Sequence, residues 1–87
     1  MRFFQPSIEG LLVIEPEIFQ DERGYFCETY NKQKLSDRIP TTEFVQDNQS
    51  LSKYGTIRGL HLQRGASAQA KLVRVISGEI LDVAVDV

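Results

Sequence analysis

The stretch "GTIRGLHLQRGASAQAKLVRVISG" (residues 55–78) carries the only histidine of the chain, His61, inside an otherwise apolar run. Residues 56–63 and 71–77 are rich in β-branched and other apolar residues, and the small and polar residues 64–70 separate them. This pattern predicts two strands joined by a loop, and "ILDVAVDV" (residues 80–87) predicts a further strand after a turn at Gly78. The stretch therefore favours a β fold.

The residues that precede this stretch continue the same pattern. "LLVIEPEIFQ" (11–20) and "YFCETY" (25–30) flank "DERG" (21–24), which predicts a hairpin. "NKQKLSDRI" (31–39) predicts a short helix with Asn31 as its N-cap, ending before Pro40. "TEFVQDNQS" (42–50) alternates again and predicts a strand. We therefore expect an all-β fold with one short helix near residues 31–39.

Length and composition favour one ordinary globular domain, residues 1–87. The chain has 87 residues, of which 41% are apolar and 25% are charged. It contains no apolar run long enough to predict a membrane helix or a signal peptide. A single cysteine, Cys27, fits a reducing cytoplasm. The apolar last strand stops at Val87 without a turn or polar tail, so we expect the chain to be the N-terminal half of a barrel about twice as long.

Charge is distributed unevenly along the chain. The net charge of −2 argues against nucleic acid as a partner. Residues 48–78 nevertheless contain five Lys or Arg and no Asp or Glu, and this basic block includes His61. An anionic ligand such as a phosphate would explain the block, and so would a solvated basic face balanced by acids elsewhere.

The spacing of Gly55, His61, Gln63, Lys71 and Gly78 resembles the first motif of the cupin superfamily. In metal-binding cupins two histidines and a glutamate of this motif hold a divalent cation. Here glutamine stands at the second histidine position and lysine at the glutamate position. A protonated lysine has no lone pair to donate, so we expect no metal at this site.

His61 and Lys71 suggest proton transfer instead of metal binding. A neutral imidazole can take a proton near neutral pH, and a lysine in a partly dehydrated cavity can stabilise an oxyanion. Such a pair suits the enolisation of a keto compound. The residue types alone leave open a structural histidine in the core with Lys71 extending to solvent.

Four segments in order resemble the dTDP-4-dehydrorhamnose 3,5-epimerase family: "DERGYFCETY", "FVQDNQS", "IRGLHLQ" and "AKLVRVISGEILDVAVDV". The resemblance implies a metal-free cupin-type jelly-roll β-barrel, here partial, that forms a homodimer by exchange of its N-terminal strands. It also implies an isomerase of dTDP-L-rhamnose biosynthesis, without cofactor, that acts on a dTDP-4-keto-6-deoxyhexose. Charge and hydropathy lead us to expect neither nucleic acid nor a membrane as a partner.

The resemblance assigns roles to individual residues. It implies that His61 is the general base and that Lys71 stabilises the keto or enolate oxygen. The implied substrate-binding residues are Arg23 and Glu28 on the N-terminal hairpin, the polar pair Gln46 and Asn48, and Arg58 at the diphosphate. Each of these residues also has a plain structural explanation, such as a turn residue, a surface carboxylate or a partner of nearby backbone.

The family's catalytic acid, a tyrosine, and the aspartate that orients the base match no position in this chain. We therefore expect the 87 residues alone to be inactive. Two alternatives stay open: an enzyme of the same fold that inverts one carbon or moves the ketone, and a non-catalytic module for nucleotide-sugar binding or dimerisation.

Overall fold

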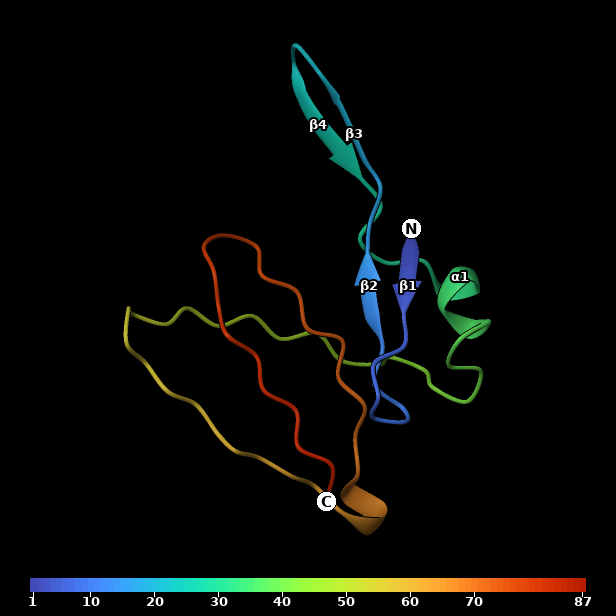
Figure 1. Ribbon diagram of the computed structural model, residues 1–87, viewed down its shortest axis with the longest axis vertical. Helices are drawn as coiled ribbons and strands as arrows, with labels where there is room; N and C mark the ends of the chain where they lie inside the picture. Colours follow the sequence, from blue (N-terminus) through green and yellow to red (C-terminus); the bar gives the residue numbers. More distant parts are fainter. The chain divides into compact units, whose positions relative to one another are not determined.

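The computed structural model describes all 87 residues and contains two antiparallel hairpins, one α-helix and one 3-10 turn (Figure 1). The strands pair β1 with β2 and β3 with β4. The elements are β1 (Arg2–Phe4), β2 (Val13–Glu15), β3 (Ile18–Asp21), β4 (Gly24–Cys27), α1 (Lys32–Ser36) and η1 (Gly65–Ser67).

The first hairpin joins β1 to β2, with Arg2 opposite Glu15 in the register. The Nη2 group of Arg2 donates to Oε1 of Glu15 over 2.8 Å, so the cross-strand pair is also an ion pair. The sequence patterns did not predict β1. They also predicted one continuous strand over residues 11–20. The structure instead has two separate strands, β2 and β3, with Pro16 between them, because proline has no backbone N–H to donate to a ladder.

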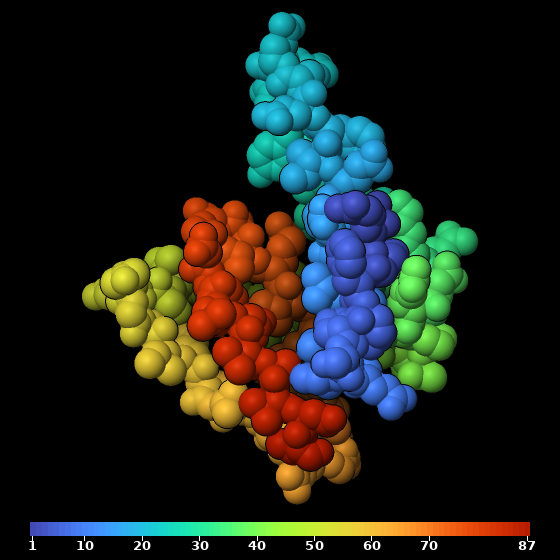
Figure 2. All heavy atoms as spheres, viewed as in Figure 1, coloured from blue at the N-terminus to red at the C-terminus, as the bar shows by residue number.

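The second hairpin, β3–β4, confirms the prediction of strands on either side of "DERG". Ile18 lies opposite Cys27 and Phe19 opposite Phe26 in the register. The rings of Phe19 and Phe26 lie 6.5 Å apart between centroids and are tilted by 41°, a favourable cross-strand aromatic contact. Both rings are largely exposed, and Figure 2 shows the side chains of this hairpin at the surface, in cyan.

Helix α1 confirms the predicted helix and its cap, although it ends at Ser36 and not at residue 39. The backbone N–H of Lys34 donates to Oδ1 of Asn31, as expected of an N-cap. Leu35 is buried, with 3% of its surface exposed. Just beyond the helix, the guanidinium of Arg38 lies 5.0 Å from the ring centre of Phe3, a cation–π contact that connects α1 to β1.

The chain divides into two compact units. Met1–Pro40 and Leu81–Val87 form the first unit, which contains both hairpins and α1. Thr41–Ile80 form the second, in which η1 is the only regular element.

The structure has no strands over residues 42–50, 56–63, 71–77 and 80–87, so this prediction was wrong. Every residue from Val45 to Val87 is exposed. Alternation specifies which side chains share a face of a strand, but a ladder also needs a partner strand in register. These segments have no such partner in the structure.

The chain nevertheless belongs to the all-β class, since it has four strands in two antiparallel sheets and one helix of five residues. No helix has the length and apolar character needed to cross a membrane. The closed jelly-roll barrel and the single domain over residues 1–87 stay predictions.

Candidate functional site

Arg23 lies in the turn between β3 and β4, where Asp21 holds it through three hydrogen bonds. The backbone N–H of Arg23 donates to Oδ1 of Asp21 over 2.9 Å. The Nε and Nη2 groups of Arg23 donate to Oδ2 of Asp21 over 3.1 and 2.6 Å. These bonds, first the side-chain and then the backbone ones, hold the pKa of Asp21 below its ordinary value. The turn therefore presents a fixed cation.

The face of the same hairpin forms an open hollow of about 470 Å³. Aromatic rings and one guanidinium line it, a combination that suits the flat base and the phosphates of a nucleotide. The lining residues are Phe19, Gln20, Asp21, Arg23, Gly24, Tyr25 and Phe26.

Glu28 lies just after β4 and pairs with the helix. Its Oε1 accepts a hydrogen bond from Nζ of Lys34 over 2.8 Å, which is also an ion pair. The bond from Lys34, followed by one from the side chain of Asn31, lowers the pKa of Glu28. Glu28 is therefore a carboxylate at neutral pH, and it is held toward α1.

Two further predicted site residues lie close together in the second unit. The side-chain amide of Gln46 donates to Oδ1 of Asn48 over a long 3.4 Å. Arg58 donates from Nε to Oγ of Ser52 over 2.9 Å. Both contacts involve exposed side chains, so they orient these groups only weakly.

The structure does not bring His61 and Lys71 together. Both are exposed residues of the second unit, and neither makes a hydrogen bond or an ion pair. The structure contains no group of three or more His, Cys, Asp or Glu side chains that could hold a metal ion. The roles of His61 and Lys71 in proton transfer stay predictions.

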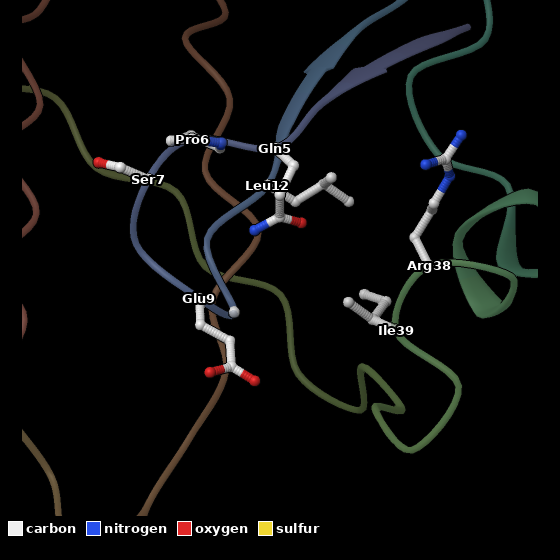
Figure 3. A pocket seen from close by; sticks show the side chains of 8 residues that line it. Gln5, Pro6, Ser7, Glu9, Leu12, Arg38 and Ile39 are labelled. Atoms are coloured by element: carbon white, nitrogen blue, oxygen red, sulfur yellow. The ribbon is translucent and has the colours of Figure 1, made fainter.

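A separate pocket of about 380 Å³ lies between the loop that joins β1 to β2 and the residues just beyond α1. Figure 3 shows the side chain of Gln5 directed into that loop, where its amide donates to the carbonyl oxygens of Ile8 and Leu11 over 3.3 and 3.0 Å. None of the predicted site residues lines this pocket. Its lining consists of Gln5, Pro6, Ser7, Glu9, Gly10, Leu12, Arg38 and Ile39.

Sequence reasoning missed the hydrogen-bond partners of the predicted site residues. Asp21 accepts from Arg23, Glu28 accepts from Lys34, and Ser52 accepts from Arg58. The first could have been found, because an Asp two residues before another turn residue commonly accepts that residue's backbone N–H. The pairs of Glu28 and Arg58 each span six positions, and no local rule identifies them.

Comparison with known proteins identifies the family. The family model described as dTDP-4-dehydrorhamnose 3,5-epimerase matches residues 5–87. The chain belongs to the dTDP-4-dehydrorhamnose 3,5-epimerase family. Its sequence is 54% identical over 85 residues to the enzyme of that name from Methanothermobacter thermautotrophicus, 98% of this chain and 45% of that protein being covered.

Two bacterial members of the epimerase family give the same result. The protein from Salmonella typhimurium is 50% identical over 88 residues, and the one from Escherichia coli K12 is 44% identical over 88 residues. All of this chain and 48% of each relative are covered. The chain thus spans about half the length of the curated relatives it matches. No solved structure was found to match it.

Proposed function

We propose that the protein carrying this chain epimerises dTDP-4-dehydro-6-deoxy-D-glucose at C3 and C5 to dTDP-4-dehydro-L-rhamnose, a step of dTDP-L-rhamnose biosynthesis. The observation that carries the proposal is the match of the epimerase family model to residues 5–87. Relatives up to 54% identical bear the name of this activity.

The chemistry requires a base and a group that stabilises negative charge. C3 and C5 both flank the C4 ketone, so removal of a proton from either carbon gives an enolate. His61 would take the proton through its imidazole nitrogen, and the ammonium of Lys71 would stabilise the charge that develops on the C4 oxygen. Return of a proton to the opposite face inverts the carbon. No redox cofactor is needed, because no electrons leave the substrate.

Binding of the nucleotide sugar would use the remaining predicted residues. Arg23 and Arg58 suit diphosphate oxygens, because a guanidinium donates two parallel hydrogen bonds. Glu28, Gln46 and Asn48 would accept from or donate to hydroxyl and amide groups of the ligand. The aromatic and cationic lining of the β3–β4 hollow supports this placement for Arg23.

The working protein would be a cytoplasmic homodimer with exchanged N-terminal strands, and neither nucleic acid nor a membrane would be its partner. The exposed apolar side chains of the hairpin support the dimer, since Ile18 is 60% and Phe26 69% exposed in the single chain. A second copy would cover surface that is otherwise costly to leave in water. The single cysteine, Cys27, is compatible with the cytoplasm.

The test follows solvent deuterium into the keto sugar by NMR, using the whole native gene product that carries this chain. The unmodified protein should place deuterium at both C3 and C5. His61→Asn should slow exchange by about 10²- to 10⁴-fold, the usual worth of a general base, and leave the Kd for dTDP within a few-fold. Gln69→Asn, a change in the same unit, is the control and should leave exchange intact.

The alternatives give different outcomes in the same experiment. Deuterium at one carbon only would indicate an enzyme that inverts a single centre. Tight binding of dTDP without any exchange would indicate a non-catalytic module. Full exchange by His61→Asn would overturn the role of His61 as the base.

A further inference from the structure

The Asp21–Arg23 contact uses one side of the guanidinium and leaves the other open. A guanidinium has five N–H donors. The Nε–H and one hydrogen of Nη2 point at Oδ2 of Asp21. Both hydrogens of Nη1 and the second of Nη2 remain, and together they form a second edge that can donate two parallel bonds.

We propose that Asp21 is a positioning residue that holds the guanidinium of Arg23 by its Nε edge, so that the Nη1 edge faces a diphosphate. This inference rests on the proposed function for the identity of the ligand, a nucleotide sugar. Asp21 itself does not touch the ligand. It acts through Arg23.

Positioning matters here because little else restrains Arg23. The side chain of Arg23 is 87% exposed, and the bonds to Asp21 are the only ones it makes in the structure. A free arginine side chain loses much rotamer entropy when a ligand fixes it. Asp21 fixes that rotamer before the ligand arrives. The turn also fixes the position of Asp21, through the backbone N–H of Arg23.

The carboxylate of Asp21 also has an opposite effect, because its charge repels a diphosphate. Salt screens that repulsion over roughly 8 Å at physiological ionic strength. The two effects predict opposite changes in the affinity for a diphosphate when the carboxylate charge is removed. If positioning dominates, binding weakens; if Asp21 merely competes with the ligand for Arg23, binding strengthens.

The test compares two changes that each remove one negative charge from the same turn. Asp21→Asn keeps a side-chain oxygen that can accept the backbone N–H of Arg23, but loses the charged acceptor of the guanidinium. Glu22→Gln is the matched control, because Arg23 makes its hydrogen bonds and its ion pair with Asp21 and none with Glu22. The readout is the Kd for dTDP, measured by calorimetry on the whole native gene product.

Asp21→Asn should weaken dTDP binding by about three- to tenfold, as expected of an exposed charge-assisted contact. Glu22→Gln should stay within about twofold of the unmodified protein, on the tighter side. A tighter Kd for Asp21→Asn would overturn the inference, and so would equal effects of the two changes.

A double-mutant cycle separates positioning from simple stabilisation of the turn. With Arg23→Gln already present, Asp21→Asn should cost no further affinity, since the group that Asp21 positions is gone. A full loss in that background would mean that Asp21 supports the hairpin and not Arg23, and the inference would fail.

Inorganic pyrophosphate as a second probe keeps the inference distinct from the proposed function. If dTDP does not bind but pyrophosphate does, and Asp21→Asn weakens it, the proposed nucleotide sugar is wrong and the positioning role stands. If pyrophosphate binds and Asp21→Asn leaves it unchanged, the positioning role is wrong whatever the substrate. If neither probe binds the unmodified protein, both proposals fail.

Discussion

Two segments of this chain predict a hairpin equally well, and only one of them forms it. Residues 18–27 pair as β3 and β4 around a turn that contains Gly24 with φ +138°. Residues 71–87 alternate as regularly and bend at Gly78 with φ +90°, yet the structure contains no strand there.

The difference lies in the turn and not in the alternation. In the first segment Asp21 accepts the backbone N–H of Arg23, and a cross-strand aromatic pair reinforces the register. No side-chain hydrogen bond fixes the turn at Gly78. A turn with its own hydrogen bonds sets the register of a hairpin, whereas alternation alone leaves it open to slippage.

The largest effect should come from Leu35, because it is the only residue of the chain that is buried. Leu35→Ala removes a buried side chain, a change that costs about 2 to 5 kcal/mol in protein cores. Amide hydrogen exchange should then accelerate at Leu35, Arg38 and Ile39, whose N–H groups bond within and just after α1.

Leu51→Ala is the control for this change, because Leu51 is 93% exposed. It should leave every exchange rate unchanged. If both leucine changes accelerated amide exchange equally, burial would not distinguish the two units, and the proposed difference between them would be wrong.

The two turns can be compared directly by adding one methyl group to each. Gly24→Ala should cost roughly 1 to 3 kcal/mol of hairpin stability, because φ +138° is a conformation that only glycine adopts easily. Gly78→Ala should cost far less, since no ladder holds its φ positive and the backbone can relax. No atom lies within 4 Å of either added Cβ, so collisions play no part.

Amide exchange and near-ultraviolet circular dichroism of the aromatic pair would report both changes. Loss of the Phe19–Phe26 signal in Gly24→Ala alone is the expected result. A similarly large rise in amide exchange around residue 78 in Gly78→Ala would show that the second turn is also held, and the two turns would then not differ.

These contrasts show which parts of the structure can be predicted from the sequence. Local signals identified the β3–β4 hairpin, the Asn31 cap and α1, because each depends on residues a few positions apart. They failed for residues 56–63 and 71–77, because a strand needs a partner as well as a pattern. Among the site residues, Arg23 and Glu28 acquired charged partners, whereas His61 and Lys71 remain apart from any partner.

The smallest expected effect concerns the ion pair between Glu28 and Lys34, which joins the end of the hairpin to the helix. Lys34→Gln should raise the pKa of Glu28 toward its ordinary value of 4.5, because the largest cause of the lowering is lost. The bond from Asn31 would remain, so part of the lowering should persist. Carbon-13 NMR of the Glu28 carboxyl during a pH titration measures this shift, and Lys53→Gln in the other unit is the matched control.

The same pair predicts a pH window for stability. Because the pKa of Glu28 is lower in the folded chain, the stabilisation is fully present above pH 4.5 and is lost as pH falls through the folded pKa. Lys34→Gln should therefore lower the thermal midpoint slightly at pH 7 and much less in acid. Both side chains are partly exposed, so salt should reduce the difference. A midpoint difference that is as large in acid as at pH 7 would show that Lys34 stabilises α1 by packing and helix propensity, and the link between hairpin and helix would then not be electrostatic.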